Sequence, residues 1–176
     1  MNTLFCEEAA RRTIDCRVFS HQKLAATDGI WPVFQVMAYK AFPEDSVDAL
    51  RLAHHTASTF ADDLVRHVQP HLQDGTVVLC HTMNAALLHG LARWLAQLPS
   101  RAGLRLRIGL NLPPDFRDRR PEIVFFNRFE YQLALNLLRA ACPGLKWYAE
   151  TRELAEIFHP LGAVGVERKR LPTRVI

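Results

Sequence analysis

The sequence predicts an α/β domain in which a mostly parallel sheet is flanked by helices on both faces. Short apolar runs rich in β-branched residues alternate with longer stretches that carry apolar residues at helical spacing. The connections between these segments are short, which favours right-handed crossovers between parallel strands. The length of 176 residues fits one domain with a substantial core, so we expect a single domain over residues 1–176.

The N-terminal part predicts four elements, in the order helix, strand, extended strand and helix: residues 4–12, 14–19, 30–36 and 43–68. Pro32 favours an edge position for the third of them, because proline cannot donate to a strand ladder. Acidic residues from Glu44 suit the start of the fourth, and Pro70 is expected to end it. A doubly wound domain usually opens with a strand, so this order suggests either that the chain lacks the first strand or that the N-terminal segment packs differently.

The rest of the chain alternates strand and helix, with strands at 76–80, 104–110, 145–149 and 164–171, and helices from Thr82 to about residue 97, at 129–141 and at 151–159. The first of these helices is apolar nearly all round, which predicts that it is the most buried helix. Residues 121–126 remain ambiguous between helix and loop. The strands that end near Leu79, Leu110 and Ala149 should be parallel neighbours.

Composition and charge exclude several classes of protein. The net charge is +4, and the arginine clusters at 117–120 and 168–170 are short, so they fit a solvated surface, phosphate contact or peripheral contact with an anionic membrane. No basic motif interleaved with aromatic residues occurs, so we expect no nucleic-acid partner. Four cysteines lie far apart without a CxxC pair, and no signal peptide or membrane-span run is present, which favours a cytoplasmic protein with reduced thiols.

The sequence also lacks the best-marked motifs for cofactors and nucleophiles. It contains no GxGxxG, no GxxxxGK[ST] and no GxSxG. His67 and His71 have the spacing of a helical metal pair, but Pro70 lies between them and no third ligand is evident. We therefore expect neither a metal ion nor a cofactor, and the catalytic residues remain unknown.

Polar side chains follow the predicted strands where each strand ends. His21 follows the first strand, and the other members of this group are His81, Thr82, Asn111 and Thr151. The carboxyl ends of parallel strands share one edge of a sheet, and that edge is the usual ligand crevice. Helix capping by Thr82 or Asn84 before one helix, and by Thr151 before another, explains these residues equally well, and a structural hydrogen bond explains His81. Arg128, near a helix start, could bind a phosphate or carboxylate or lie on the surface.

Residues 75–176 resemble the N-terminal half of GT-B glycosyltransferases of the retaining group-1 type. The resemblance rests on VVLCHTMNAALLHGLARWL, LRLRIGLNLPPDF and LKWYAETRELAEIFHPLG, and the terminal RKRLPTRVI is similar to the segment before the family's interdomain linker. It implies a Rossmann-like domain that binds the sugar acceptor, while a second domain binds the nucleotide-sugar without a metal. The residues it carries over as crevice-edge residues are His81, Thr82, Asn111 and Thr151.

The resulting prediction is the acceptor-side domain of a glycosyltransferase, truncated at both ends and inactive alone. Its partners would be a glycan or lipid-linked acceptor and either a missing donor domain or further copies of itself. One alternative is a non-catalytic α/β protein that binds a ligand or another protein. Another is a small stand-alone enzyme in which His81 acts as acid and base.

Overall fold

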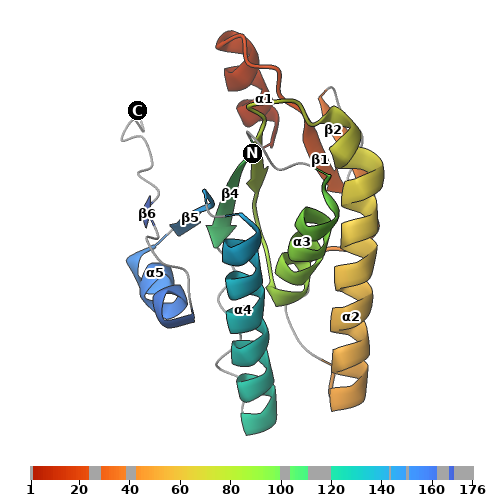
Figure 1. Cartoon of the computed structure of the whole chain (residues 1–176), viewed down its shortest axis with the longest axis vertical. Coiled ribbons are helices and arrows are strands. Elements are labelled where there is room, and N and C mark those ends of the chain that lie inside the picture. Colours follow the sequence, from red (N-terminus) through yellow and green to blue (C-terminus); the bar gives the residue numbers. More distant parts are fainter. Residues whose placement is uncertain are drawn as a thin grey trace.

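The computed structural model describes residues 2–23, 29–38, 43–99, 104–110, 120–142, 144–149, 151–161 and 167–168. It confirms the α/β class. Two parallel sheets are present, and helices flank them (Figure 1). The smaller sheet pairs β1 (Val18–His21) with β2 (Ile30–Phe34). The larger has the order β3 (Val77–Cys80), β4 (Arg105–Leu110), β5 (Lys146–Ala149) and β6 (Glu167–Arg168).

The helices follow the predicted alternation. They are α1 (Asn2–Arg11), α2 (Ser46–Asp63), α3 (Ala85–Gln97), α4 (Pro121–Ala141) and α5 (Arg152–Phe158). A π-helical turn at Leu64–Val68 and a 3-10 turn at Gln69–His71 continue α2, and a second 3-10 turn at His159–Leu161 continues α5. Pro70 lies within the turn at Gln69–His71, and the helical run ends one residue later, because proline lacks the N–H that the interior of an α-helix needs.

The larger sheet buries one face of its central strands. β3, β4 and β5 are parallel neighbours as predicted, with Val78 opposite Leu106 and Ile108 opposite Trp147. The inward residues of β4 are fully buried, and they belong to the same core cluster as residues of α3 and α4. On β3 the alternate residues Val77 and Leu79 are exposed.

The position of α3 confirms the burial prediction. Its residues Leu88, Leu91, Trp94 and Leu95 have no exposed surface. The reason is that α3 packs against α2 on one side and α4 on the other (Figure 1). α3 is apolar on more than one face because it has more than one neighbour.

Two element boundaries differ most from the sequence prediction. α4 begins at Pro121 rather than at residue 129, because proline is well suited to the first turn of a helix and the ambiguous residues 121–126 continue from it. The first strand begins at Val18 rather than residue 14, and it extends to His21 through its pairing with β2. Pro32 lies opposite Ser20 in a two-stranded sheet, where both strands are edges.

Candidate functional site

The turn after β3 presents two polar side chains to solvent. His81 and Thr82 are both exposed, and the His81 Nδ1 lies 2.8 Å from the Thr82 hydroxyl. Thr82 has a positive φ of 61°, a conformation that costs energy for a β-branched residue. The prediction that His81 is accessible at the carboxyl end of its strand is confirmed.

A glycine in the neighbouring strand makes room for the His81 ring. A Cβ placed on Gly109 would lie 3.3 Å from the His81 Cδ2 and 3.6 Å from the Cys80 carbonyl oxygen. The imidazole therefore lies against β4, on the same face of the sheet as Val77 and Leu79, as strand alternation predicts. Larger side chains at position 109 would have to displace it.

Thr82 and Thr151 differ in whether they cap a helix. Asn84, rather than Thr82, caps α3, because its side-chain oxygen accepts a hydrogen bond of 3.0 Å from the Leu87 amide. Thr82 lies two residues before that cap and contacts His81 instead. Thr151 does cap α5, and its hydroxyl accepts a hydrogen bond of 3.2 Å from the Leu154 amide. Of the two predicted caps of α3, the structure therefore has Asn84 and not Thr82, and the cap predicted at Thr151 is confirmed.

The remaining predicted site residues are not brought to His81 by any described contact. Asn111 lies outside the described residues. Arg128 is exposed on α4, and Thr151 is exposed at the start of α5. A crevice shared by His81, Asn111 and Thr151 therefore stays a prediction.

Cys80 points away from His81 and packs against the core. Burial raises the pKa of the Cys80 thiol to about 12. Because the thiolate is the reactive form, Cys80 of the folded chain should resist iodoacetamide at about pH 8 and react only as the pH approaches its pKa. Mass spectrometry of the digested protein measures this, with the chain unfolded in guanidinium as the reactive control. Equal labelling of the folded and unfolded chains would contradict it.

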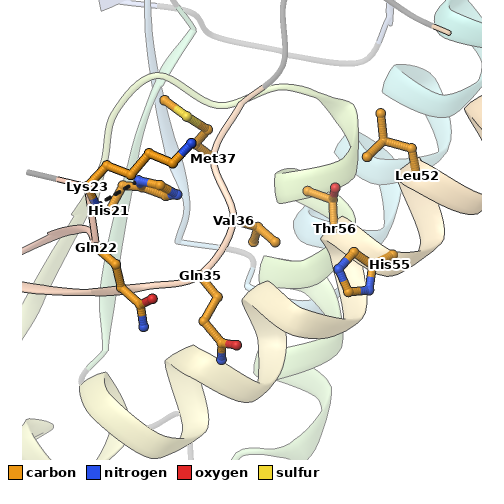
Figure 2. A pocket seen from close by; sticks show the side chains of 9 residues that line it. All are labelled: His21, Gln22, Lys23, Gln35, Val36, Met37, Leu52, His55 and Thr56. Carbon is orange, nitrogen blue, oxygen red and sulfur yellow. Dashed lines mark hydrogen bonds between the residues drawn. The ribbon is translucent and has the colours of Figure 1, made fainter.

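A pocket opens at the carboxyl ends of β1 and β2. Its volume is about 370 Å³, and its walls come from the residues after both strands and from α2 (Figure 2). Nine residues line it: His21, Gln22, Lys23, Gln35, Val36, Met37, Leu52, His55 and Thr56. This placement is the one expected for a ligand site in a parallel sheet.

The lining combines hydrogen-bonding groups with an apolar patch. Figure 2 shows His21, Lys23 and Met37 facing Leu52, His55 and Thr56 across the pocket, with Val36 between the two groups. No carboxylate occurs among these nine side chains, whereas a lysine and two histidines do. The pocket can therefore donate hydrogen bonds to hydroxyl or anionic oxygens.

Buried contacts hold the pocket wall in place. The Asp63 carboxylate is fully buried and accepts 2.8 Å hydrogen bonds from both the backbone amide and the side-chain amide of Gln35. The Lys23 amide donates to the His21 Nδ1 over 3.1 Å. The Gln22 side-chain amide donates to the Val33 carbonyl oxygen over 3.3 Å. Asp63 thus ties the chain after β2 to the end of α2.

Arg120 joins the N-terminal ends of α2 and α4. Its guanidinium donates to the carbonyl oxygens of Pro43 and Glu44 over 3.3 and 3.2 Å. These residues precede α2, while Arg120 directly precedes α4. The two helices flank α3, so their linked ends lie beyond the N-terminus of α3 (Figure 1).

Sequence reasoning identified only part of this arrangement. It placed His21 at a strand end, but it assigned no binding role to His55, which lines the pocket from α2. The pattern of strand ends followed by an amphipathic helix was the sequence signal that could have located this pocket. The hydrogen bonds between Asp63 and Gln35 have no sequence signature.

Potential metal-ligating side chains do not cluster in the part of the chain that the structure describes. There, no group of three or more histidine, cysteine, aspartate or glutamate side chains is arranged to hold a metal ion. His71 instead contacts Arg17 and stacks on Phe19, with ring centroids 5.9 Å apart.

No protein-family model, curated protein or solved structure gave a significant match. Among the described residues, no helix has both the length and the hydropathy required to cross a lipid bilayer.

Proposed function

We propose that this chain is the acceptor-side domain of a glycosyltransferase, with the pocket at the ends of β1 and β2 as a sugar-binding site. The observation that carries the proposal is the chemistry of that pocket. Imidazole, amide, ammonium and hydroxyl groups lie beside the apolar side chains of Val36 and Leu52. Sugars present both hydroxyl groups and an apolar face of C–H groups, so such a lining suits them.

The exposed turn at His81 supports the same function. An imidazole and a hydroxyl lie at the carboxyl end of a parallel strand, which is the edge where ligands of α/β domains bind. The sequence resemblance to GT-B glycosyltransferases adds the expectation that the sugar bound is the acceptor. Transfer would then need a donor-binding domain.

Calorimetric titration of the full chain tests the proposed function. The probes are free hexoses, hexose phosphates and uridine-diphosphate hexoses, injected separately. We expect a free hexose or hexose phosphate to bind, and His55→Ala to weaken that binding about tenfold because it removes one hydrogen-bonding group from the wall. His54→Ala is the matched control, since His54 is an adjacent exposed histidine that does not line the pocket.

Three outcomes would contradict parts of the proposal. Binding of none of the probes would favour the non-catalytic interaction protein. Equal losses for His54→Ala and His55→Ala would place the ligand elsewhere. Turnover of a nucleotide-sugar by the chain alone, abolished by His81→Ala, would favour the small stand-alone enzyme instead.

A further inference from the structure

The outer face of α4 carries an apolar stripe of four large side chains. Phe125, Phe129, Leu133 and Leu137 follow one another at intervals of four residues. Residues four apart lie on neighbouring positions of one helix face, so the four side chains form a continuous row over three turns. Their exposed fractions are 73, 51, 39 and 45%, and we call them the α4 stripe.

The α4 stripe is distinct from the face that anchors α4 in the domain. The inner face consists of Tyr131, Ala134, Leu135 and Leu138, all of them buried in the core. At 100° per residue, the stripe is centred about 180° from that inner face. Glu130 lies on the α3 side, where its carboxylate is 2.9 Å from the His89 Nε2. The stripe therefore serves no described contact within the domain.

The apolar area of the α4 stripe makes it a candidate interaction surface. An aromatic side chain offers about 200 Å² and leucine a similar area, so the stripe presents roughly 400 Å² of apolar surface. A patch of about 400 Å² is in the range of the largest apolar patch that a soluble monomer usually exposes, and such patches are often functional.

We infer that the α4 stripe is a homodimer interface, in which the α4 helices of two copies pack antiparallel. The two-fold axis crosses the outer face of α4 at the level of residue 131 along the helix. It places Phe125 against Leu137 of the second copy and Phe129 against its Leu133. Every layer then pairs an aromatic ring with a leucine. A parallel arrangement would instead stack like on like and would align the two helix dipoles unfavourably.

Charge also favours a second copy in this orientation. Glu122 and Arg139 lie at opposite ends of the stripe. In the antiparallel pairing, Glu122 comes opposite position 140 of the second copy, one residue from its Arg139, and the contact occurs twice. A membrane surface fits less well, because α4 carries two acidic and two basic residues (Glu122, Glu130, Arg128 and Arg139), whereas membrane-surface helices are rich in lysine and arginine.

The size of the stripe sets the expected affinity. Two copies would bury roughly 800 Å² through these side chains, below the approximately 1,200 Å² of a stable interface. We therefore expect a dimer that dissociates in the micromolar range. Sedimentation of the full chain from about 1 to 100 µM should show a concentration-dependent monomer–dimer equilibrium.

Two charged variants test the surface. Phe129→Glu should abolish the dimer and leave the thermal melt of the monomer nearly unchanged, because Phe129 is exposed. Leu50→Glu is the matched control: Leu50 is 51% exposed on α2 and lies outside the stripe, so that variant should still dimerise. A monomer at every concentration, a dimer that survives Phe129→Glu, or binding of the unsubstituted monomer to anionic vesicles through Phe129 would overturn the proposal.

Cysteine cross-linking tests the antiparallel register. An equimolar mixture of Phe125→Cys and Leu137→Cys chains should form a disulfide-linked heterodimer under mild oxidation. Either variant alone should not self-link through these sites, because like positions would lie about 18 Å apart along the helix. The unsubstituted chain controls for the native cysteines. Self-linking of each variant alone would show a parallel pair and overturn the register.

Discussion

Replacing Leu91 with alanine should lower the free energy of unfolding by about 2–5 kcal/mol. Leu91 has no exposed surface and lies in α3, which packs against α2 and α4. The truncation removes apolar contacts and leaves a cavity between helices that are each held by other contacts. The site therefore cannot collapse easily, which places the cost within the range measured for buried leucines. Leu88, equally buried, should behave in the same way.

Urea unfolding followed by circular dichroism measures this loss. Leu50→Ala is the control, because Leu50 is a leucine on the exposed side of α2 and its truncation should change stability by no more than about 0.5 kcal/mol. Equal midpoints for Leu91→Ala and Leu50→Ala would contradict the central position of α3.

The sequence predicted the order of elements well because hydrophobic periodicity is a local signal. The run from Ala85 to Leu95 is apolar on more than one face, and that pattern alone indicated a helix with more than one neighbour. The strand ends at His21 and His81 were equally readable. Both expectations depend on residues that are close together in the chain.

Features that depend on tertiary contacts could not be read in this way. Asp63 and Gln35 are 28 residues apart, and nothing in either segment indicates that the carboxylate is buried against the backbone of the other. Thr82 and Asn84 are both good N-cap residues, and only the backbone path after β3 decides between them.

The α4 stripe was missed for a different reason. Its spacing is present in the sequence, but the helix was expected to begin at residue 129, which excluded Phe125 from the pattern. Once α4 begins at Pro121, the row runs across three turns. With that start, α4 has two apolar faces, one in the core and one on the surface. Hydrophobic periodicity alone does not show which of the two faces the core.

Substitution of Gly90 is the second change with a large expected effect on the free energy of unfolding. The sign of that effect shows whether packing or helix propensity dominates at this position. Alanine normally stabilises a helix interior by about 1 kcal/mol relative to glycine. At position 90, however, a Cβ would lie 2.6 Å from the Ala57 carbonyl oxygen and 3.1 Å from the Phe60 ring. The first of these atoms belongs to the backbone of α2, so relief requires α2 and α3 to move apart.

We therefore expect Gly90→Ala to destabilise the chain and Gly90→Val to do so by about 3 kcal/mol or more, because overpacking at an interface of two long helices displaces many contacts. Gly144→Ala is the control, since no atom lies within 4 Å of its added Cβ and its backbone needs no positive φ. Urea midpoints of the three variants provide the measurement. If Gly90→Val does not fold, Gly90→Ala still gives the sign: a stabilised Gly90→Ala would mean that α2 and α3 do not approach at this glycine.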